Sequence, residues 1–193
     1  FGLMNKCALN VMENFAEIAI AFGESDEYSF IFKKSSSVFN RRRDKIITTM
    51  VSLFSSAFVF HWSEFFDFPL PCPPAFDSRA VLYPDLSIVR DYLSWRQADT
   101  HINCLYNYTL CVLLSDGIAQ DVATEMLRGT DSAQKNEILF QHGVNYSFLP
   151  ESHRKGSIIL RRKKKLVVTA EDLIGDAFWK ANRSLFEDEK QKP

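Results

Sequence analysis

The sequence predicts an α+β fold built on a ferredoxin-like sheet whose first strand is absent. Apolar residues recur at helical spacing in the first fifteen positions, and two short alternating runs, a long amphipathic stretch and a further short strand follow. Helix, hairpin, helix and strand are what remains of a β-α-β-β-α-β unit when its opening strand is removed. A length of 193 residues suits one domain, here with a helical carboxy-terminal elaboration.

The chain opens with a predicted helix. Its apolar stripe consists of Leu3, Met4, Cys7, Val11 and Phe15. Because the stripe starts at once and position 1 is Phe, we expect residues upstream of this segment, which makes the chain a truncated form of a longer protein.

A β-hairpin and a long helix are expected next. Alternating apolar residues predict strands over 18–22 and 28–32, and the residues at 23–27 have the composition of a turn. The following helix is predicted over 41–66. The proline cluster at 69–74 ends it, and a strand is predicted over 79–83.

The second half of the chain is predicted to be mainly helical. The expected elements are one or two helices over 87–114, helices over 121–127 and 133–140, a strand over 157–160 that runs into five cations at 161–165, and a last patterned segment over 174–179. The charged residues at the carboxy terminus are expected to fray.

Composition excludes several classes of protein. With 46% hydrophobic and 24% charged residues, the chain is neither collagen-like nor wholly disordered. A formal net charge of −1 gives no global basic field, so any signal for nucleic-acid binding must be local. No segment approaches the roughly 20 apolar residues of a membrane span. Four scattered cysteines without a CxxC pair argue against a zinc site and a disulfide framework, and they indicate a reducing, intracellular compartment.

Asp26 and Glu27 at the predicted hairpin turn are the first candidate site. Acids are common in turns, so ordinary turn acids are the alternative. A rigid hairpin is also a scaffold on which carboxylate oxygens can hold a hard cation such as Mg²⁺.

The basic segment at 41–45 is the second candidate. Cations at the start of a helix oppose its dipole, and an anionic ligand would resolve that conflict. Arg42 and Lys45 share a helical face and, with free backbone N–H groups, could hold a triphosphate. A solvated basic face is the alternative.

Polar residues are unusually dense in the helix predicted over 87–114. Arg96, Asp99, His101, Asn103 and Asn107 fall within three turns, and buried polar groups need partners. A structural histidine is the alternative for His101.

Two further groups of polar residues suit a phosphate backbone. Lys135 and Asn136 open an otherwise apolar helix, and the run at 161–165 is wholly cationic. A solvated surface is the alternative for both.

Six ordered motifs resemble the eukaryotic tRNA-histidine guanylyltransferase family. They are GESDEYSF at 23–30, YLSWRQAD at 92–99, HINCLYN at 101–107, KNEILF at 135–140, RKG at 154–156 and IGDAFW at 174–179. The resemblance implies a polymerase-palm fold and an enzyme that adds a guanylate to the 5′ end of histidine tRNA. ATP would first activate the tRNA 5′-phosphate, the 3′-hydroxyl of GTP would attack it, and pyrophosphate would be removed afterwards.

The resemblance also implies roles for individual residues. Asp26 and Glu27 would be catalytic, and Asp26 would be a ligand of two Mg²⁺ ions. The residues that would bind GTP and ATP are Ser25, Asp26, Arg42 and Lys45. The residues that would handle the tRNA are His101, Asn103, Asn107, Lys135 and Asn136.

The sequence departs from the family pattern in two places. Cys104 stands where the family usually has Asn. An Arg-Leu-Asp-Gly-Arg motif, which supplies the second carboxylate ligand of the two Mg²⁺ ions, is expected upstream of position 1. Because the first strand of such a sheet is normally central, we expect the chain alone to be poorly folded or to associate, and to be inactive.

The resemblance implies one domain in two parts. Residues 1–150 would form the palm-like catalytic part with the tRNA-handling helices, and 151–193 its carboxy-terminal strand, basic run and tail. Histidine tRNA, GTP and ATP would be its partners, without a membrane, and it would form a homo-oligomer, by resemblance a tetramer. Its compartment would be the cytoplasm or nucleus, with a mitochondrial pool as a further alternative.

Two other functions are compatible with the sequence. The first is a non-catalytic protein that binds tRNA or assists assembly, which metal-dependent incorporation of GTP would distinguish. The second is a cyclase-like enzyme with the same palm, which leaves the motifs after Tyr92 unexplained.

Overall fold

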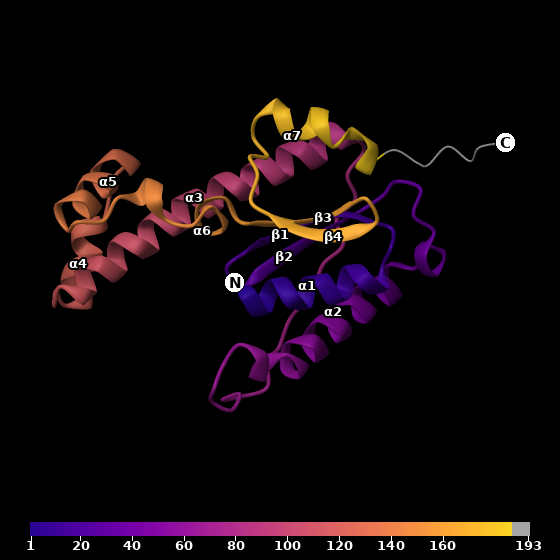
Figure 1. Cartoon of the computed structure of the whole chain (residues 1–193), viewed down its shortest axis with the longest axis horizontal. Helices are drawn as coiled ribbons and strands as arrows, with labels where there is room; N and C mark the ends of the chain where they lie inside the picture. The colour runs from indigo at the N-terminus through magenta and orange to yellow at the C-terminus, as the bar shows by residue number, and fades with distance from the viewer. Residues whose placement is uncertain (187–193) are drawn as a thin grey trace.

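A four-stranded sheet with helices on both faces forms the centre of the molecule (Figure 1). The computed structural model describes residues 1–186. Its elements are α1 (Gly2–Asn14), β1 (Ile18–Glu24), β2 (Glu27–Phe32), α2 (Arg43–Phe60), α3 (Leu86–Ser115), α4 (Gln120–Leu127), α5 (Ser132–Gln141), α6 (Glu151–Lys155), β3 (Ser157–Arg162), β4 (Lys165–Thr169) and α7 (Asp176–Ala181), with short 3₁₀ turns η1 (Val38–Arg41), η2 (Trp62–Glu64), η3 (Tyr146–Phe148) and η4 (Arg183–Leu185). The charged tail at 187–193, expected to fray, lies outside the described residues.

The sheet has the order β2-β1-β3-β4, and all its neighbours are antiparallel. β1 is paired on both sides, with β2 and with β3, so the ladder is continuous. The expectation that the chain alone folds poorly or associates, and is inactive, stays a prediction. The α+β class is confirmed, and β3, from the last quarter of the sequence, completes the sheet that the opening hairpin begins.

Two apolar layers fix the helices to the sheet. α1 and α2 cover one face, where Val11, Met12 and Phe54 pack with Ile159. α3 and α7 cover the other face, where Leu93 and Phe178 pack with inward-facing residues of β1 and β3. All seven residues of β1 are buried, because side chains on both of its faces meet helices.

α3 is much longer than the sheet is wide. Its 30 residues span about 45 Å. The first half packs on the sheet, and the second half continues beyond it and carries α4 and α5 as a helical extension (Figure 1). None of the described helices is long and apolar enough to cross a membrane.

Several element boundaries differ from the sequence prediction. The helix predicted over 41–66 ends at Phe60, where η2 and aromatic packing around Trp62 replace the regular helix. Residues 79–83 form no strand, because no neighbouring strand pairs with them. β4 and α6 were not predicted. β4 follows a basic turn and only its middle is apolar, and α6 has five residues.

Gln97 connects α3 to two other segments. The side chain is 4% exposed, and its amide nitrogen donates to the carbonyls of Lys155 (2.8 Å) and Glu171 (3.0 Å). Its amide oxygen accepts from the backbone N–H of Leu173 at 2.6 Å. One buried amide therefore satisfies three backbone groups where α3, the start of β3 and the segment before α7 meet.

We expect Gln97→Leu to lower the free energy of unfolding by about 3 kcal/mol or more, because each unsatisfied buried polar group costs about 1–3 kcal/mol. Urea unfolding of the full chain measures the change. Gln141→Leu, at an exposed position of α5, is the matched control and should change the free energy by less than about 0.5 kcal/mol. Equal effects of the two substitutions would contradict the role given to Gln97.

Candidate active site

A two-residue turn joins β1 to β2 and forms the tip of the hairpin. Glu24 pairs with Glu27 across the strands, which leaves Ser25 and Asp26 as the turn. Ser25 has φ +49°, a left-handed conformation that costs roughly 1–2 kcal/mol for a residue with a side chain. Asp26 is exposed and makes no hydrogen bond or ion pair with the described residues, so its carboxylate is available to a ligand.

Arg96 of α3 fixes both ends of this turn. Its Nη2 donates to Glu24 Oε2 at 3.2 Å and also bonds to the Glu27 carboxylate. Its Nη1 donates to Asp99 Oδ2 at 3.1 Å. The Arg96 and Glu24 side chains are only 12% and 7% exposed, so their ion pair is largely shielded from water, whereas Glu27 is 57% exposed.

Glu24 is the most buried acid of this group, with a side chain 7% exposed. Besides Arg96, it accepts hydrogen bonds from Thr100 Oγ1 and Asn103 Nδ2, both at 2.9 Å. The carboxylate is thus held by three side chains of α3. Because Glu24 directly precedes the turn, this contact sets the position of Asp26 relative to the helix.

Two members of this network, Glu24 and Thr100, were not singled out in the sequence, and Arg96 was noted in the polar cluster without a role of its own. A signal for Arg96 and Thr100 exists in the sequence. Arg96, Thr100 and Asn103 follow each other at helical spacing and therefore share one face of α3. Glu24 carries no such signal, because its burial depends on where α3 crosses the hairpin.

The predicted tRNA-handling residues of α3 lie on two sides of that helix. Asn103 contacts the hairpin, and the exposed Asn107 follows it one turn later on the same face. His101 points elsewhere, and its Nδ1 lies 2.9 Å from the hydroxyl of Tyr146. Burial raises the pKa of Tyr146, so the hydroxyl stays protonated. Burial also raises the pKa of the Cys104 thiol, which is therefore neutral.

Lys135 and Asn136 lie on α5 in the helical extension. Lys135 Nζ donates to the Thr130 carbonyl at 2.5 Å, and the Asn136 amide donates to the Ser132 carbonyl at 2.8 Å. Both side chains thus bond to backbone near the start of their own helix. No contact joins them to the hairpin tip within the described part of the chain.

Arg42 and Lys45 lie at the opposite end of the sheet from Asp26. β1 has seven residues, so about 20 Å of strand separates the two ends. Lys45 Nζ lies 4.7 Å from the centre of the Phe39 ring, and Arg42 Nε donates to the Phe39 carbonyl at 3.2 Å. The fold therefore gives the predicted nucleotide contacts two separate locations.

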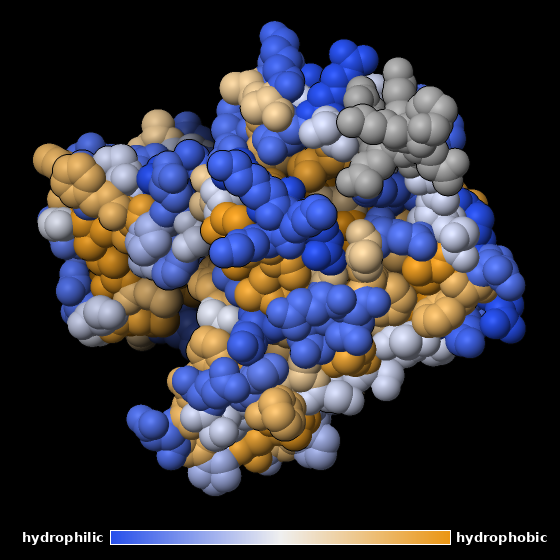
Figure 2. All heavy atoms as spheres, turned by 45° about the vertical axis from the view of Figure 1, so that its right-hand side comes forward, coloured by the Kyte–Doolittle hydropathy of each residue, from blue (hydrophilic) through white to orange (hydrophobic). Residues whose placement is uncertain are grey.

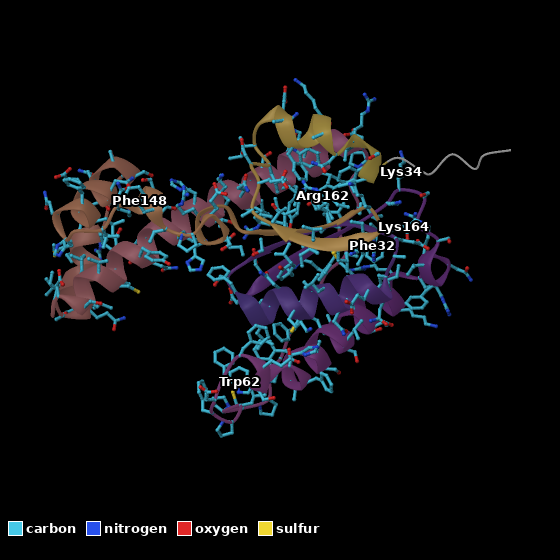
Figure 3. The ribbon with its side chains drawn as sticks, in the orientation of Figure 1. Phe32, Lys34, Trp62, Phe148, Arg162 and Lys164 are labelled. Atoms are coloured by element: carbon cyan, nitrogen blue, oxygen red, sulfur yellow. The ribbon has the colours of Figure 1, made fainter. Side chains whose placement is uncertain are left out.

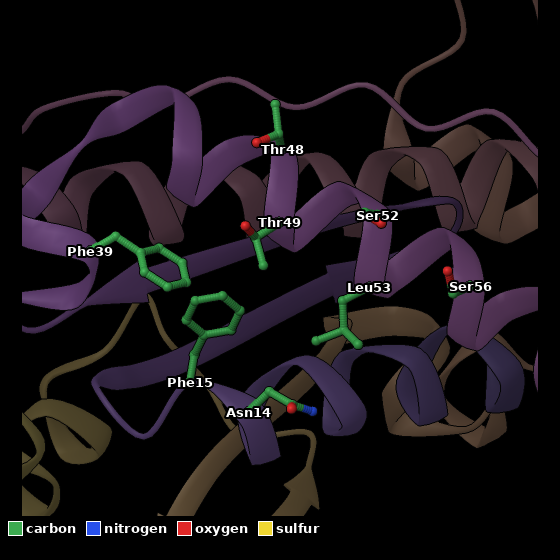
Figure 4. A pocket seen from close by; sticks show the side chains of 8 residues that line it. All are labelled: Asn14, Phe15, Phe39, Thr48, Thr49, Ser52, Leu53 and Ser56. Atoms are coloured by element: carbon green, nitrogen blue, oxygen red, sulfur yellow. The ribbon is translucent and has the colours of Figure 1, made fainter.

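Phe39 also lines an open cavity of about 530 Å³ between α1 and α2 (Figure 4). Its walls combine aromatic and aliphatic side chains with hydroxyl groups, and are formed by Asn14, Phe15, Phe39, Thr48, Thr49, Ser52, Leu53 and Ser56. None of the predicted site residues lines it, although Lys45 lies over one of its rings.

The donor set at the hairpin tip fits a single Mg²⁺ held together with phosphate oxygens. No group of three His, Cys, Asp or Glu side chains within residues 1–186 is arranged to hold a metal by itself. Mg²⁺, however, usually takes one or two protein carboxylates and completes its shell with water and substrate phosphates. Asp26 offers a free carboxylate of this kind, and Glu27 is the neighbouring acid.

Comparison with known proteins identifies related sequences over nearly the whole chain. The family described as "tRNAHis guanylyltransferase" matches residues 1–84, and "Thg1 C terminal domain" matches residues 87–192. The tRNA(His) guanylyltransferase of Schizosaccharomyces pombe is 47% identical over 199 residues, covering 92% of this chain and 76% of that protein. A probable human tRNA(His) guanylyltransferase is 41% identical and covers 97% of this chain and 72% of its own length.

Solved structures agree with this relationship. The crystal structure of tRNA(His) guanylyltransferase from Saccharomyces cerevisiae superposes with a TM-score of 0.82 at 46% identity, covering 88% of this chain and 76% of that one. A bacterial Thg1-like protein in complex with ATP superposes with a TM-score of 0.75 over 96% of this chain and 79% of its own. At 19% identity, the second match supports the fold alone.

We expect Arg96→Met to destabilise the chain by about 3–5 kcal/mol, because it leaves the buried Glu24 carboxylate without its ion pair. Chemical denaturation measures the loss. Combining Arg96→Met with Glu24→Gln removes the unpaired charge, so the double variant should be more stable than the sum of the two single effects predicts. Strictly additive effects would contradict an energetic link between the two side chains.

Proposed function

The chain belongs to the tRNA(His) guanylyltransferase family, and from this we propose that it adds a guanylate to the 5′ end of histidine tRNA. The local observation that carries the proposal is Asp26, a free carboxylate on a turn whose two ends are fixed to α3 by Arg96. Solved bacterial relatives in complex with ATP and with GTP support both nucleotides as substrates.

The proposed reaction has three steps. ATP transfers its AMP group to the 5′-phosphate of the tRNA and releases pyrophosphate, the 3′-hydroxyl of GTP attacks that activated phosphate and displaces AMP, and pyrophosphate is removed from the added nucleotide afterwards. Each step is a substitution at a phosphorus atom with little covalent chemistry for the protein to perform, so catalysis depends on positioning and on charge stabilisation. The hairpin tip suits this task because buried ion pairs hold its carboxylate in place.

We propose that Asp26 holds Mg²⁺ at the tip, with Glu27 as the neighbouring acid and Ser25 beside the nucleotide. When bound, Mg²⁺ neutralises negative charge on phosphate oxygens. Arg96 keeps Glu24 and Asp99 occupied in ion pairs, so their charge is compensated within the protein. Asp26 is left as the acid that faces solvent without a partner among the described residues.

We further propose that Arg42 and Lys45 bind a nucleoside triphosphate. The start of α2 supports this, because its first backbone N–H groups have no side-chain cap and favour an anion. The cavity beside Phe39 is next to Lys45 and could accommodate the nucleoside. About 20 Å separates this end of the sheet from Asp26, which suits a protein that uses two nucleotides.

The tRNA is proposed to run from the hairpin tip along the helical extension. Asn103 contacts the tip and Asn107 follows it along α3, which supports a path in this direction. His101, Lys135 and Asn136 would meet the tRNA farther along the extension.

We also propose that copies of the chain associate, as the resemblance to a tetrameric family suggests. Support comes from the segment after α2, where several large aromatic side chains are exposed: Phe60, Phe65, Phe66 and Phe68. Exposed apolar groups of this kind are typical of association surfaces. The cytoplasm or nucleus remains the proposed compartment.

In a chain with its amino-terminal strand restored, we expect Asp26→Asn to lower guanylate transfer by more than about a hundredfold, as loss of a group that stabilises transition-state charge typically does. A labelled-GTP incorporation assay with histidine tRNA measures it, and EDTA should abolish the wild-type activity. The affinity for tRNA should change by less than threefold, since phosphate contacts dominate that affinity. Asp121→Asn on α4 is the control with the same chemical change at a remote exposed acid. Undiminished transfer by Asp26→Asn would refute the assignment.

We expect Arg42→Ala or Lys45→Ala to raise the nucleotide concentration needed for half-maximal rate by about tenfold or more, because a charge-assisted contact contributes about 1.5–3 kcal/mol. Steady-state titrations of ATP and of GTP measure the change separately. Only one of the two nucleotides should be affected if the ends of the sheet bind different substrates. Unchanged dependence on both would return the pair to a solvated surface.

A further inference from the structure

A second tight turn lies at the end of the sheet opposite Asp26. Arg162 pairs with Lys165, so Lys163 and Lys164 are the central residues of a two-residue turn between β3 and β4. Their φ angles are +49° and +65°. Turns with positive φ at both central residues favour Asn-Gly or Asp-Gly, because a side chain such as lysine is strained there. The two lysines therefore occupy positions where they reduce stability.

Further cations surround this turn. The connection from β2 to α2 starts at the same end of the sheet, because Phe32 pairs with Ile18 while Leu160 pairs with Ile20. We use the name basic end for the cations of these two segments, which are Lys33, Lys34, Arg41, Arg42, Arg43, Lys45, Arg161, Arg162, Lys163, Lys164 and Lys165. Figure 3 shows Lys34 and Lys164 on the same side of the molecule, beyond the ends of the strands.

The basic end has a large excess of positive charge. Its eleven cations are almost half of the 23 Lys and Arg residues in a chain with net charge −1. Four acids accompany them within residues 1–186: Asp44 within the connection, Glu17 bonded to its backbone, Asp85 close to Lys34, and Glu171 paired with Arg162. No ion pair involves Lys163, Lys164 or Lys165 within the described residues, so their charge is uncompensated.

The shape and chemistry of the basic end match a nucleic-acid backbone. β2 and β4 are three strand spacings apart, about 14 Å, so the cations spread over a width that can meet several phosphates of one strand. No large exposed apolar side chain belongs to 33–45 or 161–165, which argues against insertion into a lipid surface. Figure 2 turns this side of the molecule forward and shows hydrophilic residues over much of it.

We propose that the β3–β4 turn of the basic end binds the phosphate backbone of an RNA, with Lys163 and Lys164 as principal contacts, beside the nucleotide contacts Arg42 and Lys45 and about 20 Å from the hairpin tip. The inference rests on the proposed function, because histidine tRNA is the RNA it concerns. It adds a second contact region, at the far end of the sheet from the helical extension. The strained turn is then a structural cost that phosphate binding explains.

The test uses Lys163→Asn/Lys164→Gly in the full chain. This pair removes two charges and gives the turn its preferred residues, so the free energy of unfolding should be unchanged or higher. The affinity for a histidine tRNA transcript should fall about tenfold near 0.15 M salt, and the slope of log K against log salt concentration should become shallower by about 1.4–1.8. In the transfer assay, the KM for tRNA should rise while kcat at saturating tRNA stays the same.

Two control variants separate charge at this site from charge in general. Lys163→Arg/Lys164→Arg keeps both charges and should retain the wild-type affinity. Arg79→Gln/Lys180→Gln removes two exposed cations outside the basic end and the helical extension, and should change the affinity by less than twofold. The proposal would be overturned if the second control lost as much affinity as Lys163→Asn/Lys164→Gly. It would also be overturned if Lys163→Asn/Lys164→Gly bound the transcript within twofold of wild type.

The outcomes also distinguish this inference from the proposed function. A wild-type chain that binds the transcript through Lys163 and Lys164 but transfers no guanylate would refute the proposed function and support the basic end. A wild-type chain that transfers guanylate, with binding insensitive to both lysines, would refute the basic end alone.

Discussion

The contact of one guanidinium with three carboxylates fixes the relative positions of the sheet, the long helix and the hairpin tip. Arg96 reaches Glu24 at the end of β1, Glu27 at the start of β2 and Asp99 on its own helix. A buried charge of this kind is tolerated only when every partner is present, so the geometry leaves little freedom. The apolar layers and Gln97 attach α3 to the sheet and to the segments beside it. The ion pairs join α3 to the hairpin tip, and with it they set where Asp26 stands relative to Asn103.

The sequence predicted those parts of the fold that depend on local pattern. Alternation over 18–22 and 28–32 is a property of neighbouring residues, and both strands are present. The predicted strand over 79–83 has the same kind of local pattern but no strand to pair with, and pairing is not encoded locally. β4 illustrates the converse, because its pairing with β3 makes a strand of residues whose own pattern is weak.

The site was predictable to a similar extent. Asp26 could be found because a turn between two strands is visible in the sequence, and its family motif surrounds it. The distance of Asp26 from Arg42 and Lys45 could not be predicted in the same way. Asp26 comes before β2 and the two cations come after it, so they lie at opposite ends of the strands. Both two-residue turns also place side chains in left-handed conformations, at Ser25 and at Lys163 and Lys164. Composition alone gives no sign of such strain.

The length of α3 has a mechanical consequence. Its 30 residues contain neither glycine nor proline, the usual causes of a kink, so we expect the helix to be stiff. Gln97 and Arg96 fix its first half to the rest of the fold. Roughly 18 Å of helix lies beyond Asn103, and a bend of about 5° would displace its far end by only about 1.5 Å. A change in the tilt of the hairpin would therefore displace the whole extension, because the helix between them has no glycine or proline at which it would bend.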